Sequence, residues 1–193
     1  MLALIENDRF AVVTVSDGAA PAPSWETLFG WPAAGHHAVP LTVRSTADRK
    51  RWAAQLDAAI RAADRQVLLV AEGLGCAASA WWARLTPRHD VARVAGALLF
   101  APRTDAPGLF AAPRDTLPFP SLVIRPDGEV AEVERATREW GSGIMDARAS
   151  RGAPATVAWR HAQRLFLRVT RSIAEHEIGR GAALIGLDGG RQR

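Results

Sequence analysis

QVLLVAEGLGCAASAWWA, residues 66–83, carries the clearest structural pattern in this chain. Residues 67–70 form an apolar run that is too short for an independent helix and rich in strand-favouring residues, so we predict a buried strand of a parallel sheet. Gly73 and Gly75 indicate a tight turn, and residues 77–83 contain almost nothing that opposes a helix. The stretch therefore predicts a strand, a sharp turn and a helix in direct succession.

This order of elements is the setting of a nucleophile elbow, in which a serine is held on a strained corner between a strand and a helix. The pattern of such an elbow is G-x-S-x-G, and the chain offers AEGLG at residues 71–75. Gly73 stands where the serine would be. The sequence therefore predicts the backbone frame of an elbow without its nucleophile.

The segment VLLVAEGLGC, residues 67–76, resembles the elbow V-x-L-V-A-H-S-L-G-C of the small YdeN-like serine hydrolases, the group that includes retinoblastoma-binding protein nine. Other segments fall in the order and spacing of that family, and the resemblance covers roughly residues 10–171. These segments are Trp25, WAAQLDAAI from Trp52, RVAGALLFAP from Arg93 and LPFPSLVI from Leu117. The resemblance implies a compact α/β-hydrolase fold without a separate cap domain.

Strand and helix patterns alternate along the rest of the chain. Such alternation gives right-handed βαβ crossovers and a mainly parallel sheet with helices on both faces, a three-layer α/β/α sandwich. The continuous apolar runs at 10–15, 67–70 and 94–100 are expected at the centre of the sheet. Further strands are predicted at 38–43, 121–124 and 144–147, and further helices at 46–63, 129–140 and 156–176.

The composition is typical of one ordinary domain. With 193 residues, 48% of them hydrophobic and 23% charged, the chain can bury one sizeable core. We expect a single domain over residues 1–176 and a C-terminal tail over 177–193. The sequence has no basic leader and no apolar run near the ~20 residues of a membrane span, so we predict a cytoplasmic protein without a membrane partner. The lone Cys76 agrees with a reducing compartment.

The charged residues and histidines do not indicate a further partner. The net charge of +4 comes almost wholly from arginines scattered along the chain, so we predict no nucleic-acid binding. The five histidines lack the i, i+4 or H-x-H spacing of a metal site with a third ligand nearby, and we predict neither a metal nor a cofactor. The sequence does not define an oligomeric state.

The resemblance also indicates where the other members of the family's catalytic triad would lie. The acid falls near Asp127, in a loop that is a few residues shorter here. The family's histidine follows the last strand in a G-H motif, and the matching stretch ASRGA places Gly152 at its position. Hydrolysis through this fold needs both a nucleophile and a base, so these replacements favour a protein that no longer performs the reaction.

Glu72 and Cys76 are the candidate substitutes for the serine. Cys76 lies three residues past the corner, inside the helix, and we favour a packed cysteine over a nucleophile because no basic neighbour is evident. Glu72 replaces the histidine that precedes the family's serine. It could act as a general base or a carboxylate nucleophile, but we favour a salt bridge with an arginine such as Arg103.

The backbone donors of the elbow are expected to remain. The resemblance implies two oxyanion donors, the N–H of Leu74 and an N–H from the Gly18-Ala19 turn, which would form a small anion-binding nest. Two functions therefore stay open: a non-catalytic binding or regulatory module for a small ligand or a protein, or an active hydrolase of small esters or amides. The second would use a rearranged site at Glu72, Cys76 or Asp127, and we favour the first.

Overall fold

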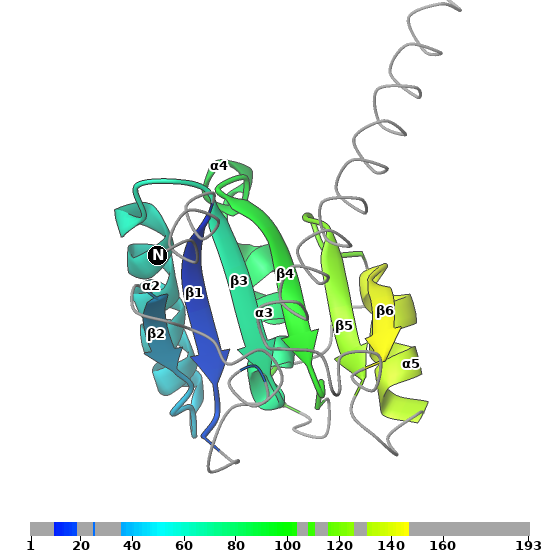
Figure 1. Ribbon diagram of the computed structural model, residues 1–193. Helices are drawn as coiled ribbons and strands as arrows, with labels where there is room; N and C mark the ends of the chain where they lie inside the picture. Colours follow the sequence, from blue (N-terminus) through cyan, green and yellow to red (C-terminus); the bar gives the residue numbers. More distant parts are fainter. Residues whose placement is uncertain are drawn as a thin grey trace, which may run out of the picture.

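The computed structural model describes residues 10–18, 25, 36–103, 108–110, 116–125 and 131–146. Their central feature is a parallel sheet with the strand order β2-β1-β3-β4-β5-β6, in which all carboxyl ends point to the same edge (Figure 1). The predicted parallel sheet is confirmed. Its strands are β1 (Ala11–Ser16), β2 (His36–Pro40), β3 (Val67–Glu72), β4 (Val94–Phe100), β5 (Ser121–Arg125) and β6 (Gly143–Asp146).

The helices in the described part of the chain cover one face of this sheet. Figure 1 shows α2, α3 and α5 behind it, and buried residues of all four helices share one apolar core with the strands. On the other face Trp25 lies edge-on to Phe100, with 5.9 Å between ring centroids. The helix predicted at 156–176 lies outside the described residues. The helices are α2 (Thr46–Ala62), α3 (Leu74–Leu85), α4 (Arg88–Val91) and α5 (Ala131–Trp140).

Strands β1, β3 and β4 lie inside the sheet, as their continuous apolar runs predict. β3 is buried along its whole length, and the other two are buried except at one or two positions. β3 also runs two residues further than predicted, to Glu72, because Ala71 and Glu72 pair with Leu99 and Phe100 of β4. No helix in the described ranges is long and apolar enough to cross a membrane.

The position of the second strand was predicted wrongly. We expected it over the apolar residues 38–43, but β2 runs from His36 to Pro40. Its register against β1 begins with His36 opposite Val12, and it ends at a proline, which has no N–H to donate to a ladder. Exposed histidines are tolerated here because β2 is an edge strand, with only Val39 buried among its residues.

The order of the strands reverses between β1 and β3. These two strands are neighbours, yet the chain continues from β1 to β2 on one side and from β3 to β4 on the other. In open parallel sheets, ligands bind beyond the carboxyl ends of the strands at such a switch point. Asp17 follows β1 and Gly73 follows β3, so the predicted elbow lies at the switch point of this sheet.

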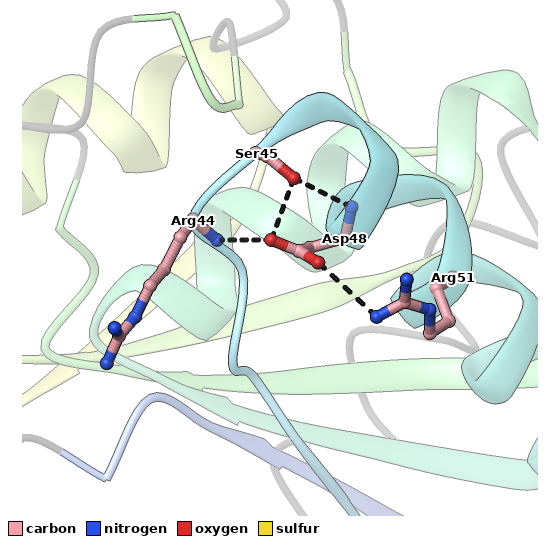
Figure 2. A network of polar contacts seen from close by, with 4 residues as sticks. All are labelled: Arg44, Ser45, Asp48 and Arg51. Carbon is pink, nitrogen blue, oxygen red and sulfur yellow. Dashed lines mark hydrogen bonds and ion pairs between the residues drawn. The ribbon is translucent and has the colours of Figure 1, made fainter.

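A side-chain cap fixes the start of α2 (Figure 2). The hydroxyl of Ser45 accepts the Asp48 N–H at 3.2 Å, and the Asp48 carboxylate accepts the Ser45 hydroxyl at 2.8 Å and the Arg44 N–H at 3.3 Å. The Ser45 hydroxyl and the Arg44 N–H, with a smaller contribution from the Arg51 guanidinium, hold the pKa of Asp48 below its usual value. With Ser45 as its cap the helix begins at Thr46, the residue at which the sequence predicts its start.

Helices α2 and α3 are joined by one hydrogen bond and an aromatic cluster. The indole N–H of Trp82 donates to the Asp57 carboxylate at 2.7 Å. Phe110, from the connection between β4 and β5, lies edge-on to Trp52 of α2 and Trp81 of α3, with centroid distances of 6.0 and 5.7 Å. These contacts hold α3, and with it the elbow at its first turn, against the rest of the helical layer.

The first turn of α3 is pressed against the end of β1. A Cβ atom placed on Gly75 would lie 2.7 Å from the backbone oxygen of Val15 and 3.0 Å from its Cγ1. Both groups belong to buried, regular elements that cannot move apart without disturbing the sheet. Gly75 is therefore required by close backbone approach, and this approach brings the residues after β1 to the elbow.

We expect Gly75→Ala to lower the free energy of unfolding by about 3 kcal/mol, because the new methyl group overpacks a site bounded by backbone. The measurement is urea denaturation followed by tryptophan fluorescence. Ser79→Ala is the matched control, since Ser79 is equally buried on the same helix but the change adds no atom. Equal stability of Gly75→Ala and the native protein would contradict the close approach of α3 and β1.

Candidate functional site

The predicted turn at residues 73–75 is a corner of one residue. Gly73 has φ of 58° and ψ of −124°, a backbone conformation that residues with a side chain rarely adopt. Its N–H donates to the Phe100 oxygen at 3.0 Å, and its own oxygen accepts the N–H groups of Cys76 and Arg103. Because one residue makes the whole corner, α3 begins at Leu74, three residues earlier than its apolar pattern predicts. The strained frame of an elbow is present.

The carboxylate of Asp17 lies directly in front of this corner. Its Oδ2 atom accepts the Leu74 N–H at 3.3 Å. A Cβ atom on Gly73 would be 3.2 Å from the same oxygen and 3.5 Å from Oδ1. Asp17 therefore lies against the position that a side chain at Gly73 would take, and it also accepts a hydrogen bond from the next residue, Leu74. The nest predicted at Leu74 already holds a carboxylate of the protein itself.

Arg103 connects Asp17 to the segment that follows β4. Its Nη1 atom is 3.6 Å from Asp17 Oδ2, and its backbone N–H donates to the Gly73 oxygen at 3.0 Å. The Arg103 side chain is 45% exposed, so solvent screens this ion pair and it adds little stability by itself. The role of Arg103 is geometric: through Asp17 and the Gly73 oxygen it connects the carboxyl ends of β1, β3 and β4.

Glu72 is the last residue of β3 and only 7% exposed. A salt bridge between Glu72 and Arg103 stays a prediction, and Arg103 also forms an ion pair with Asp17. Glu72 and, to a smaller extent, Asp17 both raise the pKa of the Cys76 thiol, so both carboxylates act on the first turn of α3. The corner is therefore bordered by two acidic side chains and one basic one.

Cys76 is fully buried in the first turn of α3. Its thiol donates to the backbone oxygen of Phe100, with 3.4 Å between the sulfur and oxygen atoms. Burial raises the pKa of this thiol well above its ordinary value, and the charges of Glu72 and Asp17 raise it further. Since the thiolate is the nucleophilic form, this environment keeps Cys76 in its unreactive state.

Of the other predicted site residues, only Gly18 lies among the described residues. The N–H of Gly18 donates to the Ser16 hydroxyl at 3.2 Å, which is a local turn contact. Ala19, Asp127 and Gly152 lie outside the described residues. Within the described ranges, no three histidine, cysteine or acidic side chains gather as a metal site.

Sequence reasoning missed Asp17 as a site residue. The loop that begins at Asp17 is expected at the carboxyl edge of the sheet, where ligands bind, but only Gly18 and Ala19 of this turn were named as site residues. The signal that identifies it is positional: an acidic residue that directly follows a buried strand next to the elbow strand lies at the same carboxyl edge of the sheet. The role depends on adjacency of β1 and β3, which the sequence pattern alone does not give.

The sequence model of the family described as serine hydrolase matches residues 25–152, well over half of the chain. The chain belongs to the serine hydrolase family. No curated protein matches the sequence closely enough to count as a relative. The family assignment agrees with the frame of the elbow, in which Gly73 holds the corner position.

Solved structures support the fold of this serine hydrolase family member. A protein described as a YdeN-like hydrolase from Pectobacterium atrosepticum superposes with a TM-score of 0.58 at 16% identity, covering 88% of this chain and 96% of the other. An esterase from Pyrobaculum calidifontis gives 0.48 at 13% identity, with 85% and 76% covered. The RedJ thioesterase of Streptomyces coelicolor gives 0.45 at 13% identity, with 84% and 90% covered. The family model, the parallel sheet and the likeness to the first of these structures show that the chain has an α/β-hydrolase fold.

We expect Gly73→Ala to destabilise this family member by about 2 kcal/mol, because alanine is strained at positive φ and its methyl group meets the Asp17 carboxylate. In an Asp17→Ala background the cost of the same change should fall by about 1 kcal/mol, since the steric part is removed. A double-mutant cycle by urea denaturation measures this coupling. A coupling of zero would mean that Asp17 does not lie against the corner.

We also expect the Cys76 thiol to react with a disulfide reagent at least about a hundredfold more slowly in the native protein than in the unfolded chain, because reaction requires local opening. The rate is measured at pH 8 with and without denaturant. The single cysteine makes the signal unambiguous. Rapid stoichiometric reaction of the folded protein would instead support an accessible, activated thiol.

Proposed function

We propose that this member of the serine hydrolase family is non-catalytic and serves as a binding or regulatory module for a small ligand or a protein partner. The proposal rests on one observation: the Asp17 carboxylate occupies the corner at Gly73 and Leu74. Gly73 has no oxygen to attack a substrate, and the amide of Leu74 already donates to the Asp17 carboxylate. A cytoplasmic location stays a prediction, and nucleic acid, membrane and metal partners are not part of the proposal.

The chemistry of acyl transfer explains why this corner is unsuited to it. A serine hydrolase stabilises the negative charge that develops on the substrate oxygen with backbone donors next to the nucleophile. Here the donor beside the corner is engaged by a negatively charged group, and Glu72 adds a second carboxylate nearby. A developing oxyanion would have to displace Asp17 against the repulsion of both carboxylates. The glycine at position 152, where the resemblance implies a histidine, removes the base as well.

The frame itself is retained, and this supports a binding role over simple decay of the site. Gly73 keeps a corner conformation that is costly for most residues, and Gly75 keeps the close contact with β1. Arg103 and Asp17 also tie three strand ends together at the position where α/β sheets bind ligands. The retained frame therefore keeps the ligand-binding edge of the sheet in place, which supports a binding role.

We expect the purified native protein to remain unlabelled by a fluorophosphonate probe and to hydrolyse p-nitrophenyl acetate no faster than an unfolded sample of the same chain, because the corner lacks an activated oxygen. Labelling is read by intact-mass spectrometry, which detects a stoichiometric adduct directly. Glu72→Gln and Cys76→Ala serve as controls for a rearranged enzyme.

Two results would overturn the proposal. A stoichiometric phosphonate adduct on any serine would identify a working nucleophile. Hydrolysis that is abolished by Glu72→Gln or by Cys76→Ala would favour the alternative function, an active hydrolase of small esters or amides. If both variants retained the hydrolysis, Asp127→Asn would test the remaining substitute.

A further inference from the structure

We propose that Asp17 is an internal ligand of the elbow: its carboxylate holds the position of a bound anion and excludes carboxylates, phosphates and tetrahedral oxyanions from this site. The inference rests on the proposed function, because it specifies which ligands the retained frame rejects. It makes Asp17 a specificity-determining residue of the switch point.

The contacts of Asp17 are those of a bound anion. One oxygen, Oδ2, accepts the first free N–H of α3 from Leu74 and lies 3.6 Å from a guanidinium nitrogen of Arg103. The N-terminus of a helix of this length has a partial positive charge and unsatisfied N–H groups that attract anions. The same oxygen lies 3.2 Å from the position of a Cβ atom at Gly73. Asp17 therefore blocks both the anion position and the space in front of the corner.

The fold brings this carboxylate to the helix from another element. The backbone of Val15 lies against Gly75, which places the end of β1 next to the first turn of α3. Two residues later the chain reaches Asp17, and Gly18 turns away with φ of 67°. The side chain of Asp17 is only 14% exposed, so it is held close to its partners and shielded from solvent. An incoming anion would have to compete with a group that is already in place at high effective concentration.

The negative charge of Asp17 has a second effect on selectivity. An anion that approached the Leu74 amide would be repelled by Asp17 and by the buried Glu72, both of which act on Cys76 in the same first turn. Arg103 is the opposing cation, but its charge is already directed toward Asp17. Removal of the Asp17 carboxylate should therefore free the Leu74 amide donor for an external anion.

The test uses the full chain labelled with ¹⁵N-leucine, and sodium acetate and inorganic phosphate as the probes. The Leu74 amide resonance is followed during titration at constant ionic strength. We expect no saturable shift in the native protein and a saturable shift in Asp17→Ala. The apparent dissociation constant of the variant should be at least about tenfold lower than the lowest value that the native titration allows. Adding Arg103→Gln to that variant should weaken the binding several-fold.

Asp48→Ala is the matched control. Asp48 also supplies a carboxylate to backbone N–H at the start of a helix, but it does so on α2, within the cap that Figure 2 shows. Its removal should leave the Leu74 resonance as insensitive to acetate and phosphate as in the native protein. A new Leu74 shift in Asp48→Ala would mean that the effect of Asp17→Ala is a general response to lost negative charge.

The remaining outcomes also decide the matter. Saturable binding of equal affinity in native and Asp17→Ala protein, or no shift in a folded Asp17→Ala, would overturn the inference. Asp17→Ser is the second variant, and loss of the cooperative unfolding transition in both variants would show that the carboxylate is required by the fold instead. The readout is independent of phosphonate labelling, so a catalytic native protein would refute the proposed function without changing the result of this titration.

Discussion

The elbow of this protein depends on the close approach between the first turn of α3 and the end of β1. Because Gly75 has no side chain, the helix can start in contact with the Val15 backbone, and Asp17, two residues after Val15, then lies at the corner. Asp17 reaches the Leu74 amide only because these two segments touch. The aromatic contacts of Trp81 and the Trp82 hydrogen bond hold the far side of the helix, so the corner is fixed from both directions. Local geometry at the site thus follows from packing in the helical layer.

The chemical character of the corner differs from its geometry. In geometry it is a hydrolase elbow, with one residue at positive φ between a buried strand and a buried helix. In chemistry it is a satisfied polar cluster, in which a carboxylate, a guanidinium and three backbone groups bond to one another. Such a cluster leaves fewer groups available for a transition state, because preorganised donors contribute to catalysis only when substrate charge can reach them. The family relationship therefore accounts for the backbone geometry of the site better than for the polar groups at the corner.

Features encoded by local pattern were predictable from the sequence. The apolar runs of β1, β3 and β4 gave the centre of the sheet, and the glycines at 73 and 75 gave the corner between strand and helix. The start of β2 at His36 was not predictable, because pairing with β1 and not hydrophobicity sets its register. Asp17 was missed for the same reason: its role arises from a contact across 57 positions of the chain. Cys76 was predicted as a packed thiol, and its burial agrees with that interpretation.

The position of Asp17 against Gly73 also has a bearing on the history of the chain. A glycine codon such as GGC and a serine codon such as AGC differ by one base, so a single mutation could place a serine at position 73. A serine that arose at position 73 would nevertheless meet the Asp17 carboxylate at its first side-chain carbon, and would gain no function while that carboxylate remained. The substitution would then lower stability without adding a function. The contact therefore makes the benefit of a serine at position 73 depend on a prior change at Asp17, which is distant in the sequence.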